Sequence, residues 1–385
     1  MIPYGKQDIN QNDIDSVLEV LQSDFLTQGP QVPLFEKAVS KYVGAKYGVA
    51  VNSATSALHI ACLSLGFQKG DILWTSPNTF VASANCALYC GGTVDFVDID
   101  SSTFNMCTVA LEKKLIVAKK EGILPKIVIP VHFAGQSCDM KRIHDLSIEY
   151  GFKIIEDASH AIGSKFLNQY VGNCMFSDVT VFSFHPVKII TTAEGGLATT
   201  NNQKIAERMQ LFRTHGITRD EKLLTKDSEG GWYYEQLELG FNYRLTDIQA
   251  ALGNSQLTRI QFFIEKRHMI KDRYEQLISN ENLDLPAQDK KCFSSLHLYP
   301  IQLKLEKLKK SQQEIFADFQ ANGIGVNLHY IPVHYHPYYK SLGFQEGDFP
   351  NAENYYKRAI SIPIFPAMDL KQQDLVISAI ASIVK

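Results

Sequence analysis

The sequence predicts an α/β protein, with a large domain built on a parallel or mixed β-sheet and a smaller α+β domain after it. Between residues 47 and 200, short runs rich in β-branched and aromatic residues alternate with helix-like runs. Strands and helices that alternate in this way form sheets with helices on both faces. After Leu245 the alternation ends and one long helix-like run begins, which we interpret as the bridge into the second domain.

The composition is that of an ordinary globular protein, and it disfavours several classes of function. The 385 residues are 45% hydrophobic and 21% charged, with a net charge of -3, so neither nucleic acid nor an anionic membrane is an expected partner. No apolar run approaches the ~20 residues that a bilayer span needs, and the polar N-terminus lacks a signal core. Seven scattered cysteines without a CxxC pair indicate a reducing, cytoplasmic location.

Two helices are expected near the start of the chain. Residues 8–22 follow an aspartate cap signal and carry apolar side chains at helical spacing, namely Ile14, Val17, Leu18 and Leu21. A Gly-Pro pair then breaks the chain, and a second helix is predicted over residues 32–43, ended by a glycine.

A strand, a polar turn and a helix follow one another after these two helices. The strand Val49–Val51 leads into Asn52–Ser56, where a helix rich in alanine and leucine begins. Backbone N–H groups and hydroxyls at a helix N-terminus attract an anion. An ordinary serine or threonine helix cap explains the same pattern equally well.

The middle of the chain repeats the strand–helix alternation. Strands are predicted at residues 71–77, 93–100, 126–135 and 152–157, with helices at 78–92, 108–121 and 139–151. Ligands in such sheets gather at the carboxyl ends of the strands. Phe80, Asp157, His160 and the turn at 52–56 all follow predicted strands, so this edge of the sheet is the expected site.

Lys188 lies between two runs that are typical of buried strands, residues 179–184 and 195–200. A lysine there is costly unless it is paired or used, although a lone lysine in such a place is more often solvated in a surface hairpin. Asp157 ends a strand upstream, where a helix cap is the simpler interpretation. A lysine and a carboxylate at opposite ends of a flat ligand suit pyridoxal phosphate, because the amine bonds to its aldehyde carbon and the carboxylate keeps the pyridine nitrogen protonated.

The last third of the chain is predicted to contain a smaller set of elements. Residues 246–278 are expected to form one long helix, followed by a strand at 295–303, a helix ending at Gly323 and a strand at 324–330. Histidines and tyrosines cluster at residues 329–338. Because prolines interrupt this cluster and no carboxylate lies in it, we do not expect a metal site there.

Five segments occur in a fixed order along the chain: SATSAL, TFVAS, EDASHAIG, SFHPVK…AEGG and GFNYRLTDIQAALG. Together they resemble the StrS/DegT family of pyridoxal-phosphate sugar aminotransferases, and their order and spacing match across essentially the whole chain. The resemblance implies an aspartate-aminotransferase-like fold of type I. Its large domain, residues 1–250, would hold a mostly parallel seven-stranded sheet, and its small α+β domain, residues 251–385, could also receive the first residues of the chain.

The resemblance assigns roles to four residues around the cofactor ring. Lys188 matches the lysine that bonds to pyridoxal phosphate and moves the proton during transfer, and Asp157 matches the partner of the pyridine nitrogen. His160 stands where many relatives have glutamine, beside the phenolic oxygen. Phe80 matches an aromatic residue that stacks on the ring, with a core phenylalanine as the alternative.

Four further residues match the phosphate end of the cofactor. Ala54, Thr55 and Ser183 correspond to the phosphate cradle. Asn242 resembles a residue that reaches the cofactor phosphate of the neighbouring subunit, which implies a homodimer with shared active sites. From the sequence alone, a turn asparagine would be the preferred explanation.

The remaining candidates concern the nucleotide sugar. Resemblance or positive charge suggests contacts from Tyr4, Thr27, Gln28, Gly29, His185, Arg213, Lys222, Arg244, His329 and Tyr330. The cationic side chains would meet the diphosphate unless they are simply solvated. Aromatic and imidazole groups would meet the sugar or the uracil.

Because Lys188 is present where a dehydrating branch of the family has histidine, the resemblance implies transamination. The segments FSFHPVKIITTAEGG, SPNTFVAS and HYIPVHYHPYY are most similar to the subgroup that makes UDP-4-amino-4,6-dideoxy-N-acetyl-β-L-altrosamine, on the pseudaminic acid pathway of flagellin glycosylation. L-Glutamate would give its amino group to C4 of a UDP-linked 4-keto-6-deoxy-N-acetylhexosamine. A dTDP- or GDP-linked 4-keto or 3-keto sugar is the alternative substrate.

Two functions of other classes remain open from the sequence. A nicotinamide-dependent Rossmann enzyme is disfavoured because the chain has no GxGxxG motif. A non-catalytic regulator that keeps the fold and binds cofactor or sugar is disfavoured by the intact pair Lys188 and Asp157.

Overall fold

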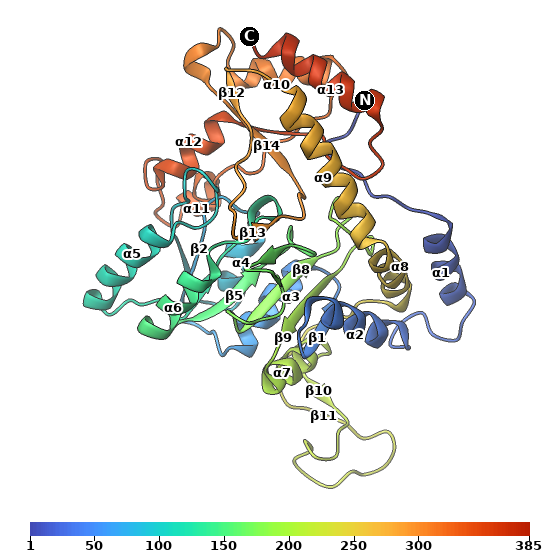
Figure 1. Ribbon diagram of the computed structural model, residues 1–385. Helices are drawn as coiled ribbons and strands as arrows, with labels where there is room; N and C mark the ends of the chain where they lie inside the picture. The colour runs from blue at the N-terminus through green and yellow to red at the C-terminus, as the bar shows by residue number, and fades with distance from the viewer.

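The computed structural model describes all 385 residues and is organised around one seven-stranded sheet (Figure 1). Its strands follow the order β1-β9-β8-β5-β4-β2-β3. The neighbouring strands β3, β2, β4, β5 and β8 pair in parallel. Strand β9 runs antiparallel to both of its neighbours, β8 and β1. The sequence-based prediction of an α/β fold with a mostly parallel sheet is therefore confirmed.

The strands and helices of this part lie close to their predicted positions. The strands are β1 (Tyr47–Val51), β2 (Ile72–Thr75), β3 (Thr93–Phe96), β4 (Ile127–Ile129), β5 (Lys153–Asp157), β8 (Val179–Ser183) and β9 (Gly196–Thr200). The helices are α1 (Gln11–Leu21), α2 (Gln31–Val43), α3 (Ala54–Ser64), α4 (Ala82–Tyr89), α5 (Thr108–Glu121), α6 (Met140–Tyr150) and α7 (Gln203–Arg213). Helix α2 ends where expected because Gly44 takes the left-handed conformation, with φ of 86°.

Helices cover both faces of the sheet because successive side chains of a strand point to opposite faces. In β5, Ile155 belongs to a buried cluster with side chains of α3, α4 and α7. Its neighbour Ile154 belongs to another cluster with side chains of α5 and α6. The strand β8 is buried along its whole length, so its end is held rigidly at the edge where a ligand would bind.

A second sheet of three short antiparallel strands lies in the last third of the chain, beside α9, α10 and α13 (Figure 1). Its strands are β12 (Leu283–Asp284), β14 (Tyr299–Leu303) and β15 (Ala359–Ile362), and the helices around it are α9 (Ile260–Leu277), α10 (Gln312–Ala321), α11 (Pro337–Lys340), α12 (Pro350–Arg358) and α13 (Leu370–Ile383). This part has its own core, which also contains Ile2 from the other end of the chain.

Two predicted elements differ from the structure. The single helix expected over residues 246–278 is broken into α8 (Asp247–Thr258) and α9 at Arg259, which has φ of -105° and ψ of 5°. The guanidinium of Arg259 binds the carboxylates of Asp8 and Asp13. The strand expected at 324–330 is absent, because this segment makes only isolated bridges, one from Ile324 to Ile2 and one from Asn327 to Ser361.

Helix α1 is held by a buried carboxylate, and Val20 is its one buried apolar side chain. Asn10 and Asp13 form a capping box at its start, and Asp13, which is fully buried, accepts hydrogen bonds from Ser255 and Gln256 of α8. The apolar side chains that indicated the helix, among them Ile14 and Leu18, are exposed.

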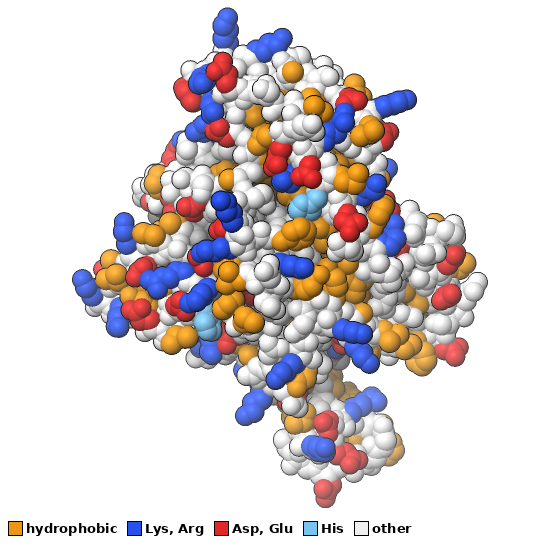
Figure 2. All heavy atoms as spheres, in the orientation of Figure 1, with side chains coloured by type: hydrophobic (Ala, Val, Ile, Leu, Met, Phe, Trp, Pro, Cys, Tyr) orange, Lys and Arg blue, Asp and Glu red, His pale blue; other side chains and the backbone are white.

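The minor strands complete the fold. A small sheet is formed by β6 (Lys165–Phe166), β7 (Gln169–Tyr170) and β13 (Cys292–Phe293), and the pair β10 (Ile217–Thr218) and β11 (Glu235–Gln236) closes an excursion, residues 219–240, that stands away from the rest of the molecule (Figures 1 and 2). Charged side chains mix there with exposed apolar ones such as Trp232 and Leu239 (Figure 2). None of the helices combines the length and the apolar character needed to cross a bilayer.

Candidate active site

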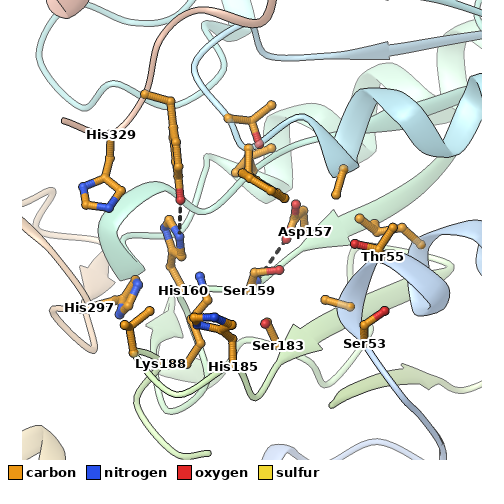
Figure 3. A pocket seen from close by; sticks show the side chains of 18 of the residues that line it. Ser53, Thr55, Asp157, Ser159, His160, Ser183, His185, Lys188, His297 and His329 are labelled. Carbon is orange, nitrogen blue, oxygen red and sulfur yellow. Dashed lines mark hydrogen bonds between the residues drawn. The ribbon is translucent and has the colours of Figure 1, made fainter. Parts of the chain in front are cut away.

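A cavity of about 840 Å³ lies at the carboxyl ends of β5 and β8 (Figure 3). Seven stretches of chain contribute to its lining: the N-terminal segment, the start of α3, the residues before α4, the loop after β5, the loop after β8, the segment around residue 297 and the segment 327–330. Eleven of the predicted site residues line this one cavity: Tyr4, Ala54, Thr55, Phe80, Asp157, His160, Ser183, His185, Lys188, His329 and Tyr330.

Lys188 is placed by the loop that joins β8 to β9. Its backbone N–H donates to the carbonyl of His185 at 2.9 Å, so the loop turns sharply and carries the side chain into the cavity. The lysine is half-buried. Burial lowers its pKa to about 8, against the opposing attraction of Asp157. The amine therefore loses its proton more readily than that of an ordinary lysine, which favours its action as a nucleophile or a base.

Asp157 is the last residue of β5, and its carboxylate faces the cavity with 5% of the residue exposed. One oxygen accepts a hydrogen bond of 2.5 Å from the hydroxyl of Ser83, which itself lies 2.9 Å from the hydroxyl of Thr79. The other oxygen accepts from the backbone N–H of Ser159 at 3.0 Å. These donors fix the carboxylate in one orientation, as a partner for a cationic group needs.

Helix α3 begins at the other end of the cavity (Figure 3). Ser53 caps it by accepting from the N–H of Ser56, and the first N–H groups of a helix have no partner within it. A Cβ atom on Gly196 would lie only 2.5 Å from the backbone N of Ala54, so strand β9 and the start of α3 approach as closely as glycine permits. Together with Ser183, this end offers the donors and the positive dipole that a phosphate requires.

Three buried histidines lie on the side of the cavity where Lys188 lies (Figure 3). His160 has a pKa well below its usual value because of burial and of the charge on Lys188. His297 is affected in the same way, by burial first and then by its neighbours, and burial lowers the pKa of His329 to about 3. All three imidazoles are therefore neutral near pH 7.

These residues fit pyridoxal phosphate. A half-buried lysine, a fixed carboxylate and a helix N-terminus surround one cavity, and the exposed ring of Phe80, 59% accessible, adds an aromatic face to the lining. The arrangement also matches, since Figure 3 shows the start of α3, with Ser53 and Thr55, across the cavity from Lys188. No group of three histidine, cysteine or acidic side chains is arranged to hold a metal ion.

The cluster at residues 329–338 divides between two environments. His329 and Tyr330 line the cavity, whereas His334 is fully buried elsewhere and lies 2.9 Å from the carboxylate of Glu353. Glu353 also accepts a hydrogen bond from the N–H of Gly347. His334 therefore stabilises the part of the chain around α12.

Other candidate residues lie outside this cavity. The guanidinium of Arg213 is bound to the carboxylate of Glu36, at 2.5 Å, and to the carbonyl of Ala50. The turn formed by Thr27, Gln28 and Gly29 is fastened to α8, because the N–H of Gly29 donates to Asp247. Three further candidates that do not line the cavity are Lys222, Asn242 and Arg244, of which Lys222 and Asn242 are exposed.

Several residues of the site were not predicted. His297, Ser83 and Ser159 contact the predicted residues or line the cavity, and so do Glu194 and Asn327. The signal for Ser159 was its place two residues after Asp157, where its N–H can turn back to the carboxylate. No local pattern marks His297, because it lies 137 positions after His160 (297 minus 160) in a segment that is typical of a strand.

The chain is similar to known aminotransferases over its whole length. The model of the DegT/DnrJ/EryC1/StrS aminotransferase family matches residues 7–381. The UDP-4-amino-4,6-dideoxy-N-acetyl-beta-L-altrosamine transaminase of Campylobacter jejuni serotype O:2 is 38% identical, over 100% of this chain and 98% of that protein. Among solved structures, PseC of Helicobacter pylori, an aminotransferase of pseudaminic acid biosynthesis, has a TM-score of 0.89 at 33% identity and covers 100% of this chain and 99% of its own.

A further solved structure bears on the cofactor. The putative sugar aminotransferase Spr1654 of Streptococcus pneumoniae, in its pyridoxal-phosphate form, has a TM-score of 0.88 at 29% identity and covers 100% of this chain and 98% of its own. The same protein in its pyridoxamine-phosphate form has a TM-score of 0.89. Both states of the cofactor thus occur on this fold.

Proposed function

Because this chain belongs to the DegT/DnrJ/EryC1/StrS family of pyridoxal-phosphate-dependent aminotransferases, we propose that it transfers the amino group of L-glutamate to C4 of a UDP-linked 4-keto-6-deoxy-N-acetylhexosamine. The product would be UDP-4-amino-4,6-dideoxy-N-acetyl-β-L-altrosamine, a precursor of pseudaminic acid for flagellin glycosylation. The observation that most supports transamination is that Lys188 and Asp157 line one cavity. The choice of sugar is supported by the resemblance to the Campylobacter and Helicobacter enzymes.

Each proposed role follows from the chemistry of a side chain in the cavity. Bound pyridoxal phosphate would supply the electron sink that amino-group exchange requires. The amine of Lys188, with its pKa of about 8, takes the proton from the reacting carbon and returns it. Asp157, oriented by Ser83 and the N–H of Ser159, holds the proton on the ring nitrogen. The start of α3, with Thr55, binds the phosphate.

The other side chains would orient the bound molecules. Phe80 is exposed toward the cavity and would stack on the cofactor ring. Tyr4, His185 and His329 lie around the same opening, where the sugar has to enter.

We also propose that the enzyme is a homodimer whose active sites are shared. Asn242 is exposed and lies outside the cavity of its own chain, so its proposed contact with a cofactor phosphate has to be made in a partner subunit. The apolar face of α1, with Leu18 and Leu21, and the excursion at 219–240, with Trp232, are exposed in one chain. Apolar surfaces of this kind are typical of subunit interfaces.

The reaction is tested by spectroscopy and by covalent trapping. We expect the purified enzyme to be yellow, borohydride to attach the cofactor to Lys188, and Lys188→Ala to abolish both properties together with turnover. A Lys188→Ala enzyme with full transaminase activity would contradict the mechanism.

The substrate is tested separately with a panel of 4-keto nucleotide sugars and L-glutamate. We expect the UDP-linked 4-keto-6-deoxy-N-acetylhexosamine to give the highest kcat/KM. A strong preference for a dTDP-linked or GDP-linked sugar would contradict the proposed substrate and leave the aminotransferase assignment intact.

A further inference from the structure

The hydroxyl of Tyr330 is placed beside His160 at the wall of the cavity. Its oxygen lies 2.9 Å from Nε2 of His160, and the two rings are nearly parallel, at 19°. Either atom could donate in such a pair. Which one does is decided by the other nitrogen of the imidazole.

Ala134 fixes the tautomer of His160. The backbone N–H of Ala134 donates to Nδ1 of the imidazole at 3.3 Å. A nitrogen that accepts a hydrogen bond carries no proton, so the single proton of the neutral ring is on Nε2. Nε2–H consequently donates to the oxygen of Tyr330. A ring with protons on both nitrogens would place two N–H groups against each other at Nδ1.

The surroundings of His160 also oppose a second proton on its ring. The imidazole of His297 packs against it with 4.4 Å between ring centroids. Nδ1 of His297 is buried without a partner. Burial and the nearby charge of Lys188 hold the pKa of His160 well below its usual value.

The backbone at Ala134 holds this arrangement in place. Ala134 has a left-handed conformation, with φ of 57°, in the short helical turn η1 (Phe133–Gly135). Its N–H reaches His160, and its carbonyl accepts from the N–H of His297 at 3.0 Å. A left-handed backbone residue that binds the side chain of one cavity residue and the backbone of another is common at functional sites.

We propose that Tyr330 is a hydrogen-bond donor aimed into the cavity, and that His160 is the positioning residue that sets the direction of its O–H bond. Because the oxygen of Tyr330 accepts a hydrogen bond from His160, the hydroxyl proton of Tyr330 has to point away from His160. Tyr330 lines the cavity, so this proton is directed into it. The acceptor is an oxygen of the molecule bound there, either the sugar or the phenolic oxygen of the cofactor. This inference rests on the proposed function, since it takes the cavity as the place of the reaction.

The first test reads the tautomer directly, without cofactor or turnover. In ¹⁵N-histidine-labelled protein free of cofactor, we expect His160 to show a protonated Nε2 and an unprotonated Nδ1 between pH 6 and 9. The loss of these signals in His160→Gln provides the assignment. A proton on Nδ1, or a ring that becomes doubly protonated in this range, would overturn the proposal.

The second test removes the hydroxyl with Tyr330→Phe in the cofactor-loaded enzyme. If the sugar is the acceptor, the KM for the nucleotide sugar rises about tenfold, while the half-reaction with glutamate keeps its rate. If the cofactor is the acceptor, the pH dependence of its absorption band shifts instead. An enzyme unchanged in both respects would show that Tyr330 donates to neither.

The role of His160 is tested by two replacements. Glutamine offers an oxygen to the N–H of Ala134 and an N–H to Tyr330, so His160→Gln should raise the KM for the nucleotide sugar less than His160→Leu does. Leucine offers neither, and His160→Leu should show part of the Tyr330→Phe effect, because the hydroxyl is then free to turn. Equal values for the two variants would contradict a positioning role.

Controls separate this inference from the proposed function. Tyr150→Phe makes the same chemical change on α6, away from the cavity, and should leave all values at those of wild type. Thermal unfolding of each variant checks that the fold is kept. If glutamate failed to convert the cofactor of the wild-type enzyme, the proposed function would be wrong, while the tautomer of His160 would still decide the orientation of Tyr330.

Discussion

Glu156 and Asp157 are neighbours in β5, but their carboxylates lie on opposite faces of the sheet. Asp157 faces the cavity. Glu156 is buried on the other side, where it accepts hydrogen bonds from Ser177 and Thr180 and lies 2.7 Å from Nε2 of His132. Burial alone would raise the pKa of Glu156, but these partners hold it below its usual value. Two adjacent acids thus have different roles: Asp157 faces the cavity, and Glu156 stabilises the packing on the other face of the sheet.

This pair allows a matched comparison of function and stability. Asp157→Asn should lower the transaminase rate by orders of magnitude, because an amide cannot hold a proton on the ring nitrogen, with little effect on unfolding. Glu156→Gln should keep the rate and lower the free energy of unfolding by about 2 kcal/mol. Steady-state kinetics and urea denaturation measure the two effects, and an inactive but stable Glu156→Gln enzyme would contradict this division.

Lys188 should make the cofactor-free protein less stable at neutral pH. Its folded-state pKa of about 8 lies below the ordinary value of 10.5, so the folded protein binds fewer protons than the unfolded chain between these values, and stability rises with pH there. Lys188→Met should therefore stabilise the cofactor-free protein by about 1–3 kcal/mol below pH 8.

The pH dependence distinguishes this explanation from a general packing effect. The gain from Lys188→Met should shrink as the pH rises from 8 toward 10.5, because the wild-type amine becomes neutral in both states. Urea denaturation of the cofactor-free proteins at pH 7 and pH 10 measures the difference. A gain that is equal at both pH values would show that the charge of Lys188 is not its cause.

At the scale of residues, the sequence predicted the charged side chains that follow or end a strand. Lys188 and Asp157 were predicted because each breaks an apolar run with a charge that needs a partner. His297 was not, because nothing in its own segment requires a polar partner. Its position depends on the turn at Ala134, whose conformation no local rule assigns to alanine.

At the scale of elements, α1 shows how one acid can fix a helix. Asp13 is fully buried and binds Arg259 together with the side chains of Ser255 and Gln256. Without this carboxylate, Arg259 keeps only Asp8 as an acidic partner, and α1 has few apolar contacts to replace the lost ones. Asp13 thus anchors the helix beside the break between α8 and α9.

Replacing that acid should release the helix before the rest of the molecule. Asp13→Ala is expected to lower the free energy of unfolding by about 3 kcal/mol and to speed hydrogen exchange in residues 11–21 more than elsewhere. Asp15→Ala, an exposed acid of the same helix, is the control and should change neither. Uniformly faster exchange over the whole chain would contradict a local anchor.

The elements were predicted well where local signals determine them. The bounds predicted for the helix at 108–121 are those of α5, since a glycine ends it. The break at Arg259 was missed because the helical pattern continues through it, and the ion pair that Arg259 makes with Asp8 joins residues far apart in sequence. The strand at 324–330 was also wrong, because its partners are one residue of the N-terminal segment and one of β15.

At the scale of the whole molecule, the cavity depends on segments from across the chain. Its lining runs from Tyr4 to Tyr330, so no single part contains the site. The proposed division between residues 250 and 251 falls inside α8, which spans Asp247–Thr258, and stays a prediction. The sheet topology was predictable from the alternation of elements, whereas the approach of the segment 327–330 to the sheet was not, because it depends on contacts over hundreds of positions.

The proposed shared sites predict that two inactive variants can restore activity together. Lys188→Ala and Asn242→Asp should each be inactive as homodimers, the second because a carboxylate repels the phosphate. In a mixed dimer, one site has both residues intact, so random mixing should restore about a quarter of the sites. Unfolding and refolding the two variants together, followed by an activity assay, makes the measurement, and no recovery from properly mixed dimers would argue against sharing.

The pairing of Ile2 with Ile324 determines when the N-terminal segment can fold during synthesis. These residues bridge one another and share a core, yet 322 positions separate them (324 minus 2). At a synthesis rate of ~5–20 residues per second, the N-terminal segment waits roughly 15–65 s on the ribosome for its partner. During that time the start of the chain offers an unsatisfied backbone edge and an apolar side chain to chaperones or to other nascent chains. The cavity, which Tyr4 and Tyr330 line together, is accordingly completed only after residue 330 has been synthesised.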